Sequence, residues 1–240
     1  MSIPKQLALH YEKEYHTGLS KQSFGGFEEA HWTNNDPRWE QTAHSLNRYF
    51  FVPYYKNYKH RLSILELGCG MCSLTTKIKS QAEQAYHYPL SVVGLDISQY
   101  ALERPLDASI SRVRACASSL PFKRGSFDFV IALDIIEHLP YETAFKAGLT
   151  DLRRIIRPDG CLLITIPLIN LDGSKDILES DGIREHYIVQ SQDWWMKELG
   201  YQNLEYVDYT HIVKDARCRK MFPFNMSPYN HFMMFIRRPD

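Results

Sequence analysis

The stretch Ser63-Ile-Leu-Glu-Leu-Gly-Cys-Gly-Met-Cys72 is an apolar run that ends in a glycine-rich turn, and residues 73–80 follow it with helical character. Gly68 and Gly70 let the backbone turn sharply. They also let a ligand approach main-chain N–H groups at a helix N-terminus, where partial positive charge gathers. A tight turn without any ligand explains the same residues, and a dinucleotide-binding loop would carry a third glycine where Ser73 stands. The stretch predicts a strand, a turn and a helix, and it leaves the ligand open.

Outward from this stretch, short apolar runs alternate with longer helical or polar segments over residues 61–167. The runs are Leu62 to Leu67, Ser91 to Leu95, Phe127 to Leu133 and Cys161 to Ile166. Such alternation is typical of βαβ units that form a parallel sheet. The sequence therefore predicts an α/β domain over residues 61–240.

The first 60 residues differ in composition, because they hold 12 of the 31 aromatic residues and show no regular hydrophobic period. They predict irregular chain followed by a helix. Asp36 is the expected N-cap and Pro37 the first helical residue, with the end near Phe51, ahead of Pro53. We expect an N-terminal lid or helical extension over residues 1–60.

Beyond Pro167 the sequence turns polar and then becomes periodic again. A helix is expected with Ser191 as its N-cap and Gly200 at the C′ position. Two strand-like runs follow at residues 204–213 and 231–236. No internal repeat or separate second domain is apparent.

The second apolar run, Val92-Val-Gly-Leu-Asp96, ends in a carboxylate 26 residues after Gly70. An acid at the end of a buried strand needs partners for its lone pairs. In doubly wound sheets this position faces the ribose hydroxyls of an adenosine ligand. The alternative role of Asp96 is an N-terminal cap for a helix that begins near Ser98.

Six segments, in their order and spacing, resemble the class I S-adenosylmethionine-dependent methyltransferases. They are Leu65-Glu-Leu-Gly-Cys-Gly70, Val93-Gly-Leu-Asp96, Leu120-Pro-Phe122, Ser126-Phe-Asp-Phe-Val130, Leu133-Asp-Ile-Ile-Glu-His138 and Leu152-Arg-Arg-Ile-Ile-Arg-Pro-Asp-Gly160. The resemblance covers roughly residues 61–167. It implies an α/β, Rossmann-like, seven-stranded and mostly parallel sheet whose last strand is antiparallel, together with S-adenosylmethionine as methyl donor.

The resemblance also implies a set of cofactor-binding residues. Glu66 would lie under the amino acid end of the cofactor, and Asp96 would hold both ribose hydroxyls. Gly68 and Gly70 would give the methionine and ribose portions close approach to the backbone. The remaining expected cofactor residues are Ile97 and Ala117 beside the adenine, and Leu133.

Two cysteines stand where the family commonly has other residues. Cys72 replaces a third glycine, and Cys116 replaces an acid that contacts the adenine amino group. Cys69 and Cys72 also form a Cys-x-x-Cys, which is typical of redox sites and of half a zinc ribbon. No second pair completes a four-ligand zinc site, so we favour neither of these two readings.

The segment Asp134-Ile-Ile-Glu-His138 follows the fourth expected strand, where the resemblance places the methyl group opposite its acceptor. A hydroxyl acceptor has a pKa far above 7, so transfer benefits from a base that removes its proton. His138 is the first candidate for that base, with Glu137 or Asp134 assisting. The alternative is that Glu137 and His138 only begin the next helix.

His186 is expected to return beside Glu137 and His138. Two carboxylates and two imidazoles would suit Mg²⁺ or Mn²⁺. The Asp-x-x-Glu-His pattern with a later His is similar to that of small-RNA 3′-terminal 2′-O-methyltransferases. Relatives without metal share much of the pattern, so no metal ligand is assigned.

The acceptor pocket is expected in the segments that match the family least. These are the aromatic N-terminal segment with Tyr11, Tyr15, Trp32 and Trp39, the loop at residues 169–184, and residues 211–231 with Lys214, Arg217, Arg219, Lys220, Phe222, Phe224 and Tyr229. Basic groups beside aromatic rings bind phosphates or nucleic acid, but they equally form a solvated loop.

Composition narrows the class of protein. The chain carries 28 basic and 28 acidic residues, which disfavours a partner held by bulk charge, so nucleic acid is not favoured. No apolar stretch approaches the length of a membrane span, and the odd number of cysteines suits a reducing compartment, so we expect a cytoplasmic protein without membrane contact. The sequence pattern indicates no particular oligomeric state.

The expected activity is methyl transfer to an oxygen, less favourably a nitrogen, of a small molecule or a glycan. Three alternatives stay open: a metal-assisted RNA 2′-O-methyltransferase, a nicotinamide oxidoreductase, and a noncatalytic nucleoside-binding module on the same fold.

Overall fold

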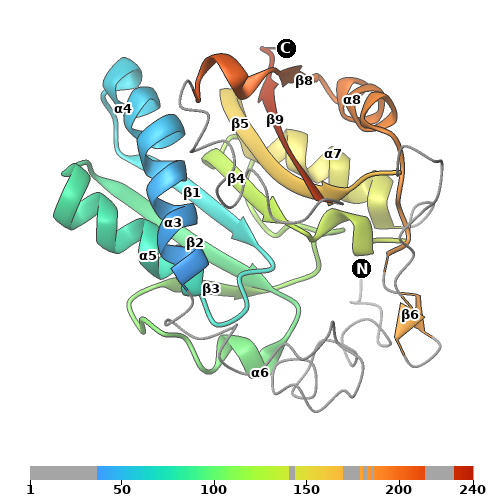
Figure 1. Cartoon of the computed structure of the whole chain (residues 1–240). Coiled ribbons are helices and arrows are strands. Elements are labelled where there is room, and N and C mark those ends of the chain that lie inside the picture. The colour runs from blue at the N-terminus through green and yellow to red at the C-terminus, as the bar shows by residue number, and fades with distance from the viewer. Residues whose placement is uncertain are drawn as a thin grey trace. The chain divides into compact units, whose positions relative to one another are not determined.

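In the computed structural model, residues 37–140, 144–169, 179–180, 183–184, 186–213 and 230–239 are described. The chain divides into two compact units, Met1–Cys116 and Ala117–Asp240. Each unit carries its own strands and helices, which Figure 1 labels. No helix in the described part of the chain combines the length and the apolar character that crossing a membrane requires.

The first unit holds three parallel strands in the order β3-β2-β1. They are β1 (Leu62–Leu67), β2 (Leu90–Asp96) and β3 (Ser111–Arg114). The side chains of β1 are almost all buried, as expected for a parallel strand covered on both faces. Helix α5 (Ser73–Gln81) follows β1 directly, so the strand, glycine turn and helix predicted from the sequence are confirmed.

The N-terminal helix of the described chain is longer than the sequence indicates. Helix α3 (Pro37–Leu46) lies beside α5 and starts at the predicted proline (Figure 1). A π-helical stretch, Asn47–Phe51, then leads into α4 (Val52–Tyr58). The predicted end before Pro53 is therefore wrong. The proline lies in the first turn of α4, where its missing N–H is tolerated, and the chain reaches it through the widened turn.

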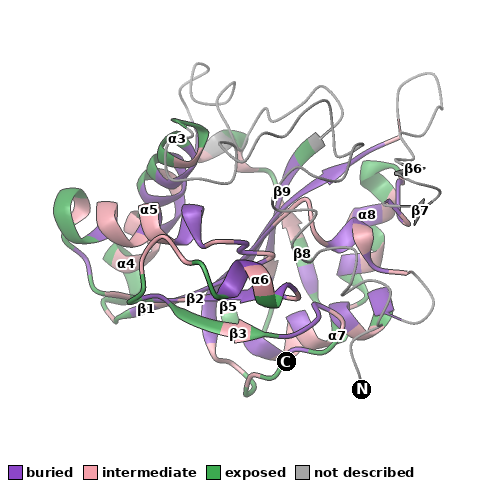
Figure 2. Ribbon diagram, turned by 90° about the horizontal axis from the view of Figure 1, so that it is seen from below, coloured by how far each residue is buried: buried purple, intermediate pink, exposed green. Residues whose placement is uncertain are grey.

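Besides a small hairpin, the described part of the second unit holds four strands, in the order β4-β5-β9-β8. They are β4 (Phe127–Leu133), β5 (Ile156–Pro167), β8 (Leu204–Val207) and β9 (Asn230–Arg237). β4 and β5 are parallel, whereas β9 runs antiparallel to both of its neighbours. β4 is buried along almost its whole length, and so is most of β5, which Figure 2 draws in purple.

The described residues of the second unit also form two α-helices and a small hairpin. α7 (Lys146–Ile155) connects β4 to β5, and α8 (Gln192–Gly200) packs against β8. The two-residue strands β6 (Glu179–Ser180) and β7 (Ile183–Arg184) pair with each other. Three strands in one unit and four in the other, mostly parallel with an antiparallel last strand, confirm the predicted Rossmann-like fold class.

Some element boundaries were predicted wrongly. β8 ends at Val207 and a 3-10 turn, Tyr209–His211, replaces the rest of the expected strand. Ser191 is the N-cap of α8 as predicted, since its side chain accepts a hydrogen bond from the backbone N–H of Trp194. Gly200, however, is the last helical residue, and Asn203 takes the left-handed conformation instead.

The sequence analysis missed strand β3. Only Val113 among its four residues is apolar, and three of the four side chains are exposed, as suits an edge strand. The predicted lid over residues 1–60 stays a prediction, because residues 1–36 lie outside the described chain.

Candidate functional site

The glycine turn after β1 takes the left-handed backbone conformation at three positions. Gly68 has φ 68°, Gly70 has φ 52° and Cys72 has φ 64°. The N–H groups of Gly68 and Cys69 both donate to the carbonyl oxygen of Leu95, at 2.8 and 3.1 Å, which ties the turn to β2. A side chain at a left-handed position costs roughly 1–2 kcal/mol, which explains why glycine is favoured where Cys72 stands. The cysteine nevertheless adopts the conformation.

The carboxylate of Asp96 joins the end of β2 to the glycine turn. Its Oδ2 accepts a hydrogen bond from the Gly70 N–H and its Oδ1 accepts one from the Ser98 N–H, both at 2.8 Å. Ser98, rather than Asp96, is the N-cap of the short helix α6 (Gln99–Leu102), because its Oγ accepts from the Ala101 N–H. A carboxylate can accept about four hydrogen bonds, so holding the turn is compatible with holding a ligand.

Glu66 lies inside the first unit and its side chain meets α5. Its Oε2 accepts a short hydrogen bond from the Thr75 hydroxyl. Burial raises the pKa of Glu66 to about 8, although the bond from Thr75 opposes that rise. The carboxyl group is therefore mostly protonated at neutral pH. Its role under the amino end of a cofactor stays a prediction.

The two cysteines of the turn pack together as thiols. Their Sγ atoms are 3.7 Å apart, and both side chains are buried. A Cβ placed on Gly94 would lie only 2.7 Å from the Cys69 Sγ, so these side chains fill the space above β2. The hydrogen bond with Cys72 and the burial raise the pKa of Cys69, whereas a reactive cysteine needs a lowered one. Cys69 and Cys72 therefore act as buried side chains that pack above β2.

The other expected adenine contacts occupy ordinary positions in their own units. Ile97 is half-buried and its carbonyl oxygen accepts from Arg114 Nε at 3.1 Å. Cys116 is buried. Ala117 is buried against α7, where a Cβ on Gly148 would lie 2.9 Å from the Ala117 carbonyl oxygen. Their roles toward a cofactor stay predictions.

Asp134 follows half-buried Leu133, the last residue of β4, and is held by β5. Its φ is 55°, an uncommon value for a residue other than glycine. The Asp134 N–H donates to the Thr165 carbonyl oxygen at 3.1 Å, and the Thr165 hydroxyl donates to Asp134 Oδ1 at 2.8 Å. Strained backbone of this kind clusters at functional sites.

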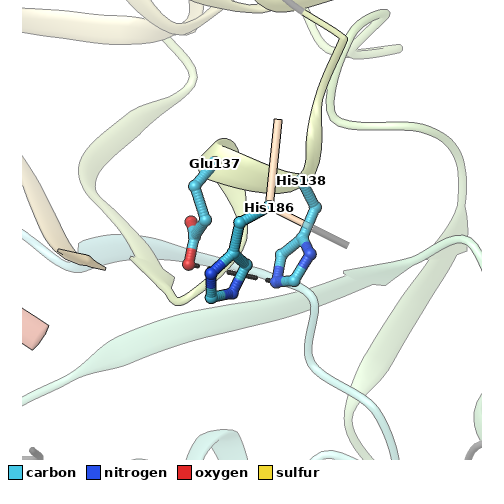
Figure 3. Close-up of side chains that lie close together, drawn as sticks. All are labelled: Glu137, His138 and His186. Carbon is cyan, nitrogen blue, oxygen red and sulfur yellow. Dashed lines mark ion pairs between the residues drawn. The ribbon is translucent and has the colours of Figure 1, made fainter. Parts of the chain in front are cut away.

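Glu137, His138 and His186 form a compact cluster in the second unit. Glu137 and His138 lie on a 3-10 turn, Ile136–His138. Glu137 Oε1 and His138 Nε2 are 3.9 Å apart, and the two imidazole ring centres are 4.9 Å apart. One carboxylate oxygen and one nitrogen of each ring all lie within 4.8 Å of one another and turn toward a common point (Figure 3). The expected return of His186 to this turn is thus observed.

Main-chain hydrogen bonds hold the cluster together. The N–H groups of Tyr187 and Ile188 both donate to the Glu137 carbonyl oxygen, at 2.9 and 3.1 Å. His186 directly precedes these residues and is itself buried. The position of His186 is therefore set by the backbone of the turn that carries Glu137.

The Glu137 carboxyl group is fully buried. Burial raises its pKa well above the usual range, the negative charge of Asp134 raises it further, and its own backbone N–H offsets part of the rise. Neither carboxylate oxygen accepts a hydrogen bond of proper geometry from the described residues. A buried acid in this state is energetically costly, so its position needs an explanation.

Sequence reasoning missed two hydroxyl groups, those of Thr75 and Thr165. Thr165 stands alone as a polar residue within an apolar run, and a buried polar group needs a partner, so the pattern carried a usable signal. The predicted acceptor residues Tyr11, Tyr15, Trp32, Lys214, Arg217, Arg219, Lys220, Phe222, Phe224 and Tyr229 lie outside the described chain, as does most of the loop at 169–184.

Comparison with known proteins identifies a family match. Residues 65–164 match the family model of a methyltransferase domain. An uncharacterized protein of Haemophilus influenzae is 26% identical over 155 residues, which covers 59% of this chain and 59% of that protein. The match thus spans less than two thirds of the relative's length.

Solved structures of the same fold cover both units. A protein of Pyrococcus horikoshii superposes with a TM-score of 0.58 at 16% identity, over 89% of this chain and 100% of its own. A SAM-dependent methyltransferase of Methanosarcina mazei superposes with a TM-score of 0.55 at 15% identity, over 78% of this chain and 98% of its own. At this level of identity the likeness shows the fold.

Proposed function

We propose that this chain is a class I S-adenosylmethionine-dependent methyltransferase that methylates an oxygen atom of a small molecule or a glycan. The match of residues 65–164 to the family model of a methyltransferase domain supports the class of enzyme. The observation that carries the oxygen is the cluster of Glu137, His138 and His186, because a hydroxyl acceptor needs help to lose its proton. A neutral amine attacks through its lone pair before it loses a proton, so it gains less from such a cluster.

The proposed cofactor site uses residues of the first unit. When bound, S-adenosylmethionine supplies a methyl group on a positively charged sulfur. Asp96 accepts hydrogen bonds from the ribose hydroxyls while it holds the Gly70 N–H, and the left-handed Gly68 and Gly70 let the ligand approach the backbone. The observed donor set fits the group, since a carboxylate fixed by two backbone N–H groups keeps its orientation toward a diol.

The proposed chemistry is a single displacement. The acceptor oxygen forms a bond to the methyl carbon, the bond from carbon to sulfur breaks, and the electron pair goes to sulfur. His138 takes the hydroxyl proton, and Glu137 and Asp134 orient or assist that base. Most of the rate enhancement comes from alignment of the reacting atoms, with base assistance adding roughly 10²–10⁴-fold.

One alternative gains support from the same cluster. A metal-assisted RNA 2′-O-methyltransferase would use the carboxylate and the two imidazoles as ligands. The balanced charge of the chain, 28 basic against 28 acidic residues, favours the small acceptor over a nucleic acid. The chain has five cysteines, and the four described ones are free thiols, which supports the proposal of a cytoplasmic site of action.

A transfer assay tests the acceptor class. The protein is incubated with S-adenosylmethionine carrying a labelled methyl group and with separate panels of hydroxyl-bearing small molecules, glycans, amines and short RNA. Label should enter the hydroxyl-bearing small molecules or glycans, and the product bond should resist mild base if it is an ether. Transfer confined to amines or to RNA would overturn the proposed acceptor while leaving the family intact.

A further inference from the structure

We propose that Glu137, His138 and His186 form a binding site for a first-row divalent transition metal ion, with Zn²⁺ as the reference ion. Binding of the metal does not require methyl transfer, so the inference goes beyond the proposed function. Within the described residues this is the group of histidine, cysteine and acidic side chains whose ligand atoms converge.

The donor set determines the class of ion. Two imidazole nitrogens and one carboxylate oxygen form the ligand set of many zinc sites that keep a fourth position open, and they suit Fe²⁺, Co²⁺ and Mn²⁺ as well. Mg²⁺ prefers oxygen ligands and retains water. Asp134, the second carboxylate expected from the sequence, is engaged by Thr165 and is not part of the converging group. The structure therefore favours a transition metal over magnesium.

The spacing of the ligand atoms fits a metal after small side-chain adjustments. Atoms bound to zinc at about 2.1 Å in a tetrahedral arrangement lie roughly 3.4 Å apart. Glu137 Oε1 and His138 Nε2 are 3.9 Å apart, and all three donor atoms lie within 4.8 Å of one another. Shifts of about an ångström, within the range of side-chain rotation, bring the atoms to bonding distance.

The strongest argument is the contrast between Glu137 and the other buried acids. Asp128 receives two hydrogen bonds from Arg157 Nη1, Glu66 receives one from Thr75, and Asp96 receives two from the backbone. The oxygens of Glu137 accept no hydrogen bond of proper geometry from the described residues, although its side chain has no exposed surface. Since a buried carboxylate needs a partner, a cation between Glu137 and the imidazoles supplies the missing interaction.

Backbone hydrogen bonds hold the residues of the proposed metal site close together. Two N–H groups, from Tyr187 and Ile188, bind the Glu137 carbonyl oxygen and so bring His186 beside the turn. Ser191, which caps α8, anchors the chain shortly after this point. A site formed on such a fixed loop loses little conformational freedom when the ion binds.

Three protein ligands leave a position for water or for an acceptor oxygen. A zinc ion lowers the pKa of a bound water to about 7. A hydroxyl acceptor bound in the same place would have a lowered pKa and would give its proton to solvent water. The ion would then take over the role proposed for His138.

The test measures metal binding to the full chain after treatment with a chelator. Titration calorimetry with Zn²⁺, Co²⁺, Mn²⁺ and Mg²⁺ should give one Zn²⁺ per chain, with Zn²⁺ and Co²⁺ binding far more tightly than Mg²⁺. The Co²⁺ form should absorb visible light with the intensity of a four- or five-coordinate site.

Variants assign the binding to the cluster. Glu137→Gln and His186→Gln should each weaken Zn²⁺ binding by more than about 100-fold, since even residues behind the ligands typically change affinity 10- to 100-fold. The matched control is His87→Gln, an exposed histidine of the first unit, which should bind Zn²⁺ as the unchanged protein does. Circular dichroism shows whether the variants are folded.

Three results would overturn the site: no Zn²⁺ binding, equal Zn²⁺ affinity in the cluster variants and the control, or Mg²⁺ binding as tight as Zn²⁺. If a cluster variant does not fold, the Co²⁺ spectrum of the unchanged chain decides alone. Asp96→Ala should lose the nucleoside cofactor and keep the metal. Failure of the metal site and failure of the proposed methyl transfer are therefore separate outcomes.

Discussion

Two turns that follow buried strands differ in how their acidic side chains are satisfied. After β2, Asp96 receives two backbone hydrogen bonds at 2.8 Å and holds the glycine turn in place. After β4, the fully buried Glu137 receives no hydrogen bond from the described residues and faces two imidazoles instead. In the first turn the carboxylate has hydrogen-bond partners without a ligand. In the second turn the carboxylate gains a partner when a cation or a proton binds.

The difference separates two kinds of acid. An acid that is already hydrogen-bonded shapes a binding surface, and removing it disturbs both the ligand and the turn. An acid without partners stores unfavourable free energy that binding can release. The following changes test that distinction, from the largest expected effect to the smallest.

Asp96→Ala should weaken S-adenosylmethionine binding by at least about 100-fold, because each hydrogen bond to a charged group contributes roughly 1.5–3 kcal/mol. The matched control is Asp107→Ala. Asp107 Oδ1 accepts the same kind of bond from the Ser109 N–H, at 2.8 Å, and its Oδ2 pairs with Lys79 of α5 and not with the N–H groups of the glycine turn. Calorimetry on both variants checks this. Equal affinities would show that Asp96 is only a turn residue.

Gly94→Ala should destabilise the protein by about 1–3 kcal/mol and weaken cofactor binding, because the added Cβ would lie 2.7 Å from Cys69 Sγ. The displaced cysteine would distort the glycine turn. The double variant Gly94→Ala with Cys69→Ala should recover part of the loss. Gly200→Ala is the control, since nothing lies within 4 Å of its Cβ. Thermal unfolding that leaves Gly94→Ala unchanged would contradict the close packing.

Glu66→Gln should change how stability depends on pH. Between the usual pKa of 4.5 and the raised pKa of about 8, the folded state keeps the proton that the unfolded state loses. The free energy of unfolding of the unchanged protein should therefore fall as pH rises through this range, by up to about 1.4 kcal/mol per pH unit.

In Glu66→Gln this part of the fall should disappear, because the amide cannot ionise. Denaturant unfolding from pH 5 to pH 8 measures the slope for both proteins. Glu83→Gln, a change at an exposed acid of the same unit, should keep the original slope. Parallel curves for Glu66→Gln and the unchanged protein would mean that Glu66 ionises in the folded state as it does in water.

Thr165→Val should have the smallest effect. It removes the hydroxyl that donates to Asp134 Oδ1 and keeps the backbone bond between the two residues. Loss of this hydrogen bond should raise the activation free energy by about 1 kcal/mol, because Asp134 is held less firmly. This corresponds to a roughly fivefold lower kcat, with little change in KM for the cofactor. Thr150→Val, on the exposed face of α7, should leave kcat unchanged. An equal kcat in both variants would remove Thr165 from the positioning of Asp134.

Prediction from the sequence worked best where the signal was local. The run from Ser63 to Cys72 predicted β1, the glycine turn and the start of α5, because apolar runs and glycines act over a few residues. It failed at Pro53, since a π-helical turn upstream let the helix continue. It missed β3, whose exposed side chains lack an apolar pattern.

For the candidate site, the sequence named the residue types but not their partners. Asp96, Glu137 and His138 were singled out by their places after expected strands. The bond from Thr75 to Glu66 and the bond from Thr165 to Asp134 were not foreseen. Each joins residues of different elements, so its existence depends on how a helix or a neighbouring strand packs.

The sequence by itself determined most of the strands and helices and the glycine turn, because hydrophobic periodicity and backbone freedom are properties of neighbouring residues. The methyltransferase family was predicted from the resemblance of its motifs. Only the tertiary structure decided that Asp134 pairs with Thr165 and does not join the group of Glu137, His138 and His186. The physical reason is that a buried charge is satisfied by whatever the folded backbone brings within about 3 Å of it, and distance along the chain does not encode that.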